Sequence, residues 1–188
     1  MSPRRSGGLA GPAVDLAADD RLADGLDADA FRAAFRNHAA GVAVITADAG
    51  DGPVALTATS VFSVSATPPL LVFSISALSS AAPTIARAGS VVVHLLDADQ
   101  VELGRLCATS GVDRFADRDR WERLPSGEPV FRDAATRIRG TVVNRLEAGT
   151  STLVVVHATH ATSTAGAHAG PLVYHNRTWH ALGEGSRI

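Results

Sequence analysis

Short runs of apolar residues, separated by small, polar or turn-forming residues, follow one another through most of the chain. β-Branched and aromatic residues are frequent within the runs, which is typical of β-strands. The pattern predicts strands at residues 42–46, 54–58, 61–65, 70–76, 90–96, 136–148 and 151–163, followed by a hairpin at residues 171–183 that turns at Asn176 and Arg177.

Helical spacing is confined to a few segments. Residues 29–38 are predicted as a helix that stops before Gly41, on the spacing of Phe31, Ala34, Phe35 and His38 behind a candidate Asp cap. Two further helices are expected at residues 83–89 and 97–111. Residues 112–129 are polar, rich in Arg and rich in turn formers, so we expect a long excursion outside the core.

Six to eight short strands with few helices, in no alternating strand–helix order, favour an antiparallel β-barrel over a parallel sheet. With 188 residues and 46% hydrophobic content, the chain is expected to form one domain. The first residues are rich in Gly, Ala, Pro, Ser and Asp without apolar periodicity. We therefore expect a flexible tail at residues 1–26 and a folded domain at residues 27–188.

The net charge and the hydropathy of the chain argue against nucleic-acid and membrane partners. The 17 basic and 19 acidic residues give a net charge of −2 without an obvious basic stripe, so no nucleic-acid partner is expected. The apolar runs are far shorter than the roughly 20 residues that span a bilayer. The N-terminus also lacks the apolar stretch of a secretory signal. We expect a cytoplasmic protein with no membrane partner.

Standard catalytic motifs are missing. Every basic residue is Arg, which excludes Schiff-base and P-loop lysines. The single cysteine, Cys107, excludes an internal disulfide and is expected as a buried structural thiol rather than a reactive one. His157 and His160 are three apart on a strand and face opposite sides, while His175 and His180 flank the last hairpin. Packing or surface roles are favoured for these histidines, so we predict no metal site and no catalytic side chain.

Hydroxyl side chains are concentrated after residue 56. By strand alternation one face is almost entirely hydroxyl, and it consists of Thr57, Thr59, Val61, Ser63 and Ser65. This face is either a solvent-exposed strand surface or a groove in which small hydroxyls let a flat polar ligand approach the backbone. A second small-polar group, SISALSSAAPTI at residues 74–85, is either an ordinary helix start or a phosphate seat that includes Ser79 and Ser80.

The order of these segments resembles the flavin reductase-like family. The matching pieces are FR..FRNHAAGVAVITA, GPVALTATSVFSVSATPPLLVFSIS, SS..P.IARAGSVVVHLL, DRFA....W and PLVYHNRTWHAL, which together extend from Phe31 to Leu182. The resemblance implies a homodimeric split β-barrel that binds FMN or FAD. It also implies an NAD(P)H-dependent flavin reductase, with NADH or NADPH as co-substrate, that supplies reduced flavin to a partner monooxygenase.

The resemblance also assigns site residues. The flavin ring and ribityl chain are expected at Thr57, Thr59, Ser60 and Val61. The ribityl hydroxyls and the phosphate are expected at Ser74, Ser76, Ser79 and Ser80. A loop that approaches the flavin or the dimer mate contains Arg114 and Phe115, although, taken alone, Arg114 favours a surface ion pair to Asp113 or Asp117.

Two departures from the family pattern bear on function. Leu78 and Ala81 stand where many members have a basic residue and a Thr near the phosphate. The nicotinamide-side signature Gly-Asp-His is here Gly149, Thr150 and Ser151. Two alternatives to the reductase therefore stay open: a flavin-binding protein without ordinary turnover, and a flavin-dependent oxidase or tailoring enzyme.

Overall fold

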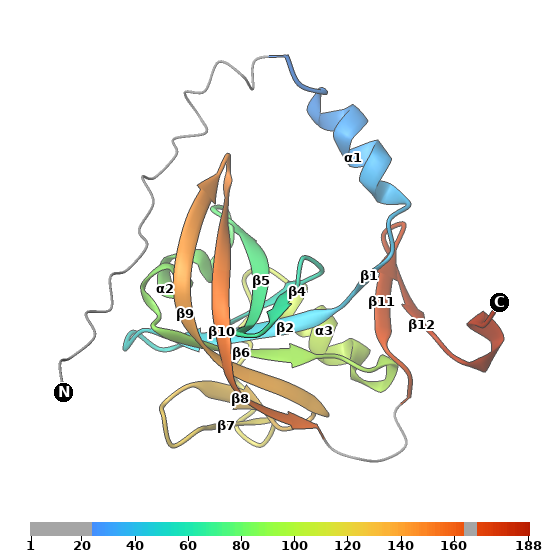
Figure 1. Cartoon of the computed structure of the whole chain (residues 1–188). Helices are drawn as coiled ribbons and strands as arrows, with labels where there is room; N and C mark the ends of the chain where they lie inside the picture. The colour runs from blue at the N-terminus through green and yellow to red at the C-terminus, as the bar shows by residue number, and fades with distance from the viewer. Residues whose placement is uncertain (1–23, 164–168) are drawn as a thin grey trace.

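A computed structural model describes residues 24–163 and 169–188, and the fold is mainly β with a few short helices, as predicted (Figure 1). The predicted N-terminal tail lies, up to residue 23, outside the described residues. No helix of the described part of the chain has the length and apolar content needed to cross a bilayer.

Seven antiparallel strands form the main sheet, in the order β3-β2-β6-β9-β10-β5-β4. Their bounds are β2 (Ala43–Asp48), β3 (Pro53–Ala58), β4 (Phe62–Ala66), β5 (Pro69–Ser76), β6 (Ser90–Leu95), β9 (Thr136–Ala148) and β10 (Ser151–Ser163). The long strands β9 and β10 coincide with the two segments predicted at residues 136–148 and 151–163. Strands β3 and β4 are consecutive in the chain yet lie at opposite edges of this order.

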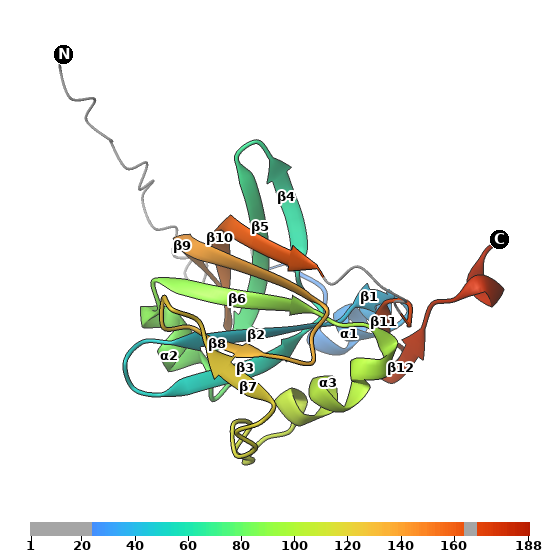
Figure 2. The same ribbon diagram turned by 90° about the horizontal axis from the view of Figure 1, so that it is seen from below.

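The first hydrophobic core lies on one face of this sheet. It unites alternate apolar residues of six strands with the helix α2 (Ala82–Arg87), whose Ile85 is fully buried. Phe73 and Val154 face each other across β5 and β10 in this core. Because β3 at one edge of the sheet and β5 next to the other edge contribute to one core, the sheet curves around it, as Figure 2 shows.

A second core covers the other face. It is closed by α3 (Val101–Ala108), which follows the 3₁₀ turn η3 (Ala98–Gln100), and by the hairpin of β7 (Trp121–Arg123) and β8 (Pro129–Phe131). Phe115, Trp121 and Phe131 are buried here, and the centroid of the Phe115 ring lies 5.0 Å from that of Trp121 and 5.2 Å from that of Phe131. The expectation that residues 112–129 lie outside the core was therefore wrong in part, because this polar segment places two aromatic anchors inside it.

A smaller unit stands at the opposite end of the molecule from α2 (Figures 1 and 2). It consists of α1 (Ala28–Arg36), β1 (Ala40–Gly41), β11 (Leu172–His175) and β12 (Thr178–Ala181), with a last 3₁₀ turn η4 (Glu184–Ser186) behind it. The predicted hairpin is confirmed, since Asn176 and Arg177 form its two-residue turn. Helix α1 is capped by Asp27 and ends at Arg36, earlier than predicted, and it buries none of its residues.

Two buried polar groups hold β6 and β8 in place. The Nδ1 atom of His94 lies 3.0 Å from the Val44 carbonyl oxygen, and its Nε2 atom accepts the Phe131 N–H at 3.1 Å. Both contacts suit the neutral ring, and burial lowers the His94 pKa to about 4. Burial would raise the pKa of Glu128, but hydrogen bonds from Arg139, Ser126 and Ser90 outweigh this and hold it at about 2.

Candidate functional site

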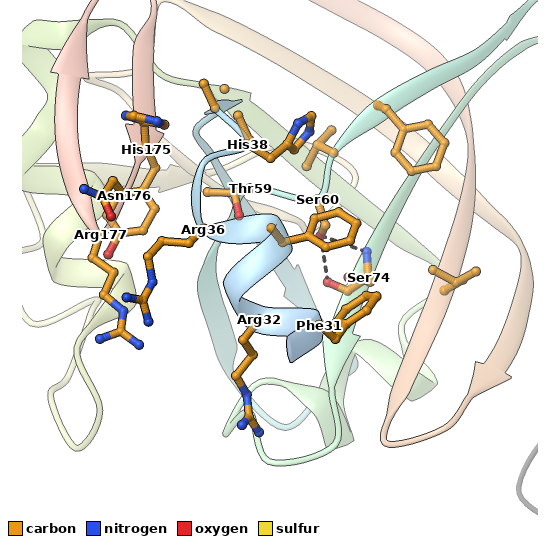
Figure 3. A pocket seen from close by; sticks show the side chains of 18 residues that line it. Phe31, Arg32, Arg36, His38, Thr59, Ser60, Ser74, His175, Asn176 and Arg177 are labelled. Carbon is orange, nitrogen blue, oxygen red and sulfur yellow. Dashed lines mark hydrogen bonds between the residues drawn. The ribbon is translucent and has the colours of Figure 1, made fainter. Parts of the chain in front are cut away.

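Most of the residues that the sequence assigned to a ligand line one of two cavities. The large cavity, of about 810 Å³, opens between α1, the start of β4 and the β11–β12 turn (Figure 3). The small cavity, of about 430 Å³, lies between α3 and the segment that precedes α2. Among the predicted residues, the large cavity is lined by Thr59, Ser60, Val61 and Ser74, and the small one by Thr57, Ser79, Ser80 and Arg114.

The large cavity begins where the chain crosses from β3 to β4. Residues 59–61 belong to neither strand, so the alternation predicted from Thr57 to Ser65 is broken and the single hydroxyl face was wrong. The Ser60 hydroxyl donates to the Ser74 carbonyl at 3.2 Å and accepts the Ser74 N–H at 3.1 Å (Figure 3). Ser60 thus fixes the backbone of β5. The exposed Thr59 hydroxyl has no partner among the described residues and is available to a ligand.

Strands β5 and β10 form another wall. Ser74 pairs with Leu153, and both line the large cavity. Ser76 and Ser151 form the next pair on that face, because side chains two apart on a strand point the same way. The backbone carbonyl of Thr150, at the tip of the β9–β10 hairpin, accepts a hydrogen bond from the Ala77 N–H at 2.9 Å. The predicted nicotinamide-side segment 149–151 therefore lies beside Ser76, next to the wall of the large cavity, although it does not line the cavity itself.

Arg114 in the small cavity is held by the end of α3. Its guanidinium donates to the carbonyl oxygens of Cys107 at 3.2 Å and Thr109 at 2.8 Å, and to the Ser80 hydroxyl at 3.3 Å. These bonds use carbonyls that a helix leaves unpaired at its C-terminus. Arg114 forms no ion pair within residues 24–163 and 169–188, so the alternative of a surface pair with Asp113 or Asp117 was wrong.

Thr57, Ser79 and Cys107 of the small cavity have roles within the protein. The Thr57 hydroxyl donates to the Gly104 carbonyl at 2.6 Å, which ties β3 to α3. The Ser79 hydroxyl accepts the Ala81 N–H at 3.3 Å at the start of α2. Burial raises the pKa of the Cys107 thiol to about 12, despite the nearby Arg114 and Arg120. Cys107 is thus a buried neutral thiol, as predicted.

Two of the residues assigned to the flavin, Ser76 and Phe115, line neither cavity. Ser76 is exposed at the end of β5, and its hydroxyl accepts the Leu78 N–H at 3.2 Å. The Phe115 ring is buried between Trp121 and Phe131 in the second core. Its position fixes the backbone next to Arg114, and its role toward a ligand stays a prediction.

Sequence reasoning missed the wall of the large cavity that comes from the chain ends. This wall contains Phe31, Arg36, His38, His175 and Arg177. Helical spacing and the hairpin turn located these residues in their elements, but no local signal shows that α1 and the β11–β12 turn meet. The Nε2 atom of His175 lies 2.8 Å from the Asn37 Oδ1 atom, and the His175 and His180 rings are 5.6 Å apart. No group of three potential metal ligands is found in the described part of the chain.

Known proteins are similar to this chain in sequence and in fold. A family model described as flavin reductase like domain matches residues 35–183. An NADH:FMN oxidoreductase of Rhodococcus qingshengii is 42% identical over 163 residues, which cover 86% of this chain and 85% of that protein. The solved structure of a flavin reductase domain protein from Arthrobacter sp. FB24 is 36% identical, with a TM-score of 0.76 over 81% of this chain and 93% of that one.

BorF, the flavin reductase component of a bacterial two-component tryptophan halogenase, is 30% identical, with a TM-score of 0.74 over 83% of this chain and 98% of that one. The match of the family model spans well over half of the sequence and includes the small cavity and, except for Phe31 and Arg32, the lining of the large cavity. The resemblance drawn from the sequence is confirmed, and the chain belongs to the flavin reductase-like family.

Proposed function

We propose that the protein is an NADH-dependent flavin reductase that supplies reduced flavin to a partner monooxygenase. The observation that supports it is the pair of cavities connected by two hydroxyl-bearing segments, residues 57–61 and 74–80. Each segment runs from one cavity to the other. A ligand with a ring system at one end and a phosphate at the other fits such an arrangement, and similar proteins are named NADH:FMN oxidoreductase and flavin reductase component.

The donor set of the two cavities suits FMN. In the large cavity, Val61 and Leu153 offer apolar surface to a flat ring, and Thr59 offers a hydroxyl without a protein partner. In the small cavity, Arg114 and the Ser80 hydroxyl offer charge-assisted and neutral hydrogen bonds to a phosphate. Bound flavin would accept a hydride from the reduced nicotinamide, so the reactive chemistry belongs to the cofactors. The protein needs to bind and orient them, which explains why no acid, base or nucleophile is required.

We propose further that the curved sheet is a split β-barrel. Its edge strands β3 and β4 are not hydrogen-bonded to each other, but the Ser60 hydroxyl links the crossing between them to β5. The opening at this crossing is where Thr59 enters the large cavity. On this account the split in the sheet provides the flavin site.

A second copy of the chain would complete the large cavity. Phe31, Phe35, Phe62 and Val64 are 53 to 57% exposed, and α1 buries no residue. Phe31, Phe35 and Phe62 line the large cavity together, and Val64 belongs to the same strand as Phe62. Exposed apolar residues gathered on one side mark an interaction surface, and we propose a homodimer that buries them. Sedimentation at micromolar concentration is expected to give a dimer that Val64→Asp converts to monomer, whereas a wild-type monomer would contradict it.

The reductase is tested by following NADH and NADPH oxidation with added FMN or FAD. We expect FMN-dependent NADH oxidation by the purified protein. Tight flavin binding without oxidation of either nucleotide would favour the flavin-binding alternative, which Thr150 and Ser151 at the Gly-Asp-His position support.

A further inference from the structure

The edge of the large cavity has positive charge that no acid of the cavity offsets. Arg32, Arg36 and Arg177 line it, and none of the lining residues within 24–163 and 169–188 is Asp or Glu. Arg32 is paired with Asp29 at 2.7 Å. The side chains of Arg36 and Arg177 have neither an ion pair nor a hydrogen bond within residues 24–163 and 169–188. In a chain whose net charge is −2, this edge is a local site for an anion.

Backbone and side-chain contacts hold the two arginines next to each other. The Asn176 N–H donates to the Arg36 carbonyl at 3.1 Å. His175 and Asn37 join the same two elements through their side chains at 2.8 Å. Figure 3 shows the Arg36 and Arg177 side chains extending in the same direction from α1 and the β11–β12 turn. The pair is therefore a site built from the two ends of the chain.

The backbone of Arg177 gives a second, independent indication. Asn176 and Arg177 have φ angles of +47° and +63°, the left-handed region required at both positions of this kind of two-residue turn. Glycine is favoured at the second position, since a residue with a Cβ atom is strained there. An arginine in a conformation that favours glycine suggests that its side chain is used.

We propose that Arg36 and Arg177 bind the pyrophosphate of the nicotinamide dinucleotide while its nicotinamide lies against the flavin ring. This inference rests on the proposed function. The flavin phosphate is assigned to Arg114 and Ser80 in the small cavity, which leaves the arginine edge for a second phosphate-bearing ligand. Guanidinium groups match phosphate oxygens in charge and in paired hydrogen-bond geometry.

The variants Arg36→Gln and Arg177→Gly test the site, with Arg187→Gln as the control. Arg187 is exposed, lines neither cavity and forms an ion pair with Glu184, so Arg187→Gln changes the net charge by the same amount as each cavity variant. Calorimetric titration of the FMN-loaded protein with NAD⁺ gives a readout that needs no turnover. We expect each cavity variant to raise the Kd for NAD⁺ and the KM for NADH about five- to tenfold, with FMN affinity unchanged. Arg177→Gly should not lower the thermal midpoint, because glycine relieves the turn.

A hydride donor without phosphates separates phosphate binding from disturbance of the ring site. With 1-benzyl-1,4-dihydronicotinamide, the variants should react as fast as the wild type. An equal loss with this donor, no change in NAD⁺ affinity, or an effect confined to FAD binding would overturn the proposal. If the wild type reduces flavin with neither donor, the proposed function fails, and the NAD⁺ titrations still decide whether the arginine edge binds the dinucleotide.

Discussion

The two cavities are built in different ways, although both combine hydroxyl groups with arginine. In the small cavity, Arg114 is held by two carbonyls of α3 and by Ser80, and Thr57 is bonded to Gly104. At the edge of the large cavity, the guanidinium of Arg36 has no partner among the described residues and comes from a helix with no buried residue. The small cavity is thus organised before a ligand binds, whereas the large one is left to adapt.

This difference suggests that the two cavities have different roles in binding. A preorganised site loses little conformational entropy on binding and therefore suits the phosphate that anchors the flavin. An open site with unpaired groups suits a co-substrate that must enter and leave in every cycle. Each prediction below alters one of the two regions and asks whether the other responds.

Lowering the pH is expected to produce the largest effect, a loss of stability that originates in the core next to the small cavity. His94 contacts Phe131, whose ring stacks on Phe115 beside Arg114. The His94 pKa is lowered from 6.5 to about 4, so the folded state binds fewer protons than the unfolded chain between these values. The unfolding free energy has its full value above pH 6.5 and should fall by about 3 kcal/mol as the pH decreases to 4. Denaturant unfolding across this window measures it.

A variant without the titrating ring provides the control. His94→Gln can still donate to the Val44 carbonyl, and it should lose most of the pH dependence between 6.5 and 4. Glu128, whose pKa is held at about 2, adds a loss of stability only below its ordinary pKa of 4.5. A wild-type unfolding free energy that is flat from pH 6.5 to 4 would show that His94 is not held neutral.

Removal of Arg114 should produce the next largest effect. Arg114→Gln is expected to weaken FMN binding about 10- to 100-fold, because a charge-assisted contact with the phosphate is lost. Riboflavin, which has the ring but no phosphate, should bind the variant and the wild type equally. Fluorescence titration with both flavins measures this. Equal weakening for riboflavin would mean that Arg114 acts through the fold of α3 rather than through phosphate.

Thr59 and Ser60 are adjacent but should respond differently. Thr59→Val removes a hydroxyl without a protein partner, so it should weaken FMN about three- to tenfold and leave the unfolding free energy unchanged. Ser60→Ala leaves the Ser74 N–H and carbonyl without their side-chain partner and should lower the unfolding free energy by about 1 kcal/mol. A Thr59→Val protein with unchanged flavin affinity would refute a direct contact.

Restoring the family signature should give the smallest effect. The double variant Thr150→Asp, Ser151→His should lower the KM for NADH by about two- to fivefold. Ser151 shares the strand face of Leu153, which lines the large cavity, so the change lies beside that cavity and away from the small one. FMN affinity, set mainly in the small cavity, should stay the same. A parallel change in FMN affinity would argue against the separation of the two sites.

The sequence predicted the strands well because their signal is local. Strands β9 and β10 and the hairpin at Asn176 and Arg177 lie where alternation and turn chemistry indicated. The face formed by Thr57 to Ser65 was mispredicted, because periodicity does not show where a chain leaves one sheet edge and crosses to the other. The segment at residues 112–129 was mispredicted in part for a related reason, since a polar segment can bury single aromatic side chains such as Phe115 and Trp121.

The parts of the candidate site that are close together in the sequence could be predicted, and the parts that are far apart could not. Thr59, Ser60 and Ser74 came from one continuous stretch, and the structure brings them to one cavity. The arginine edge could not be foreseen, because Arg36 and Arg177 are about 140 positions apart and meet only through the tertiary contact between Arg36 and Asn176.

Anaerobic mixing of the FMN-loaded protein with NADH tests the central claim most directly. If the large cavity holds the flavin ring with one face open to the nicotinamide, the visible absorbance of oxidised flavin should disappear in a single phase. The rate should saturate with NADH concentration. It should also fall in Arg36→Gln at subsaturating NADH, while the flavin stays bound. Flavin that remains oxidised on the protein, at every NADH and NADPH concentration, would contradict the account.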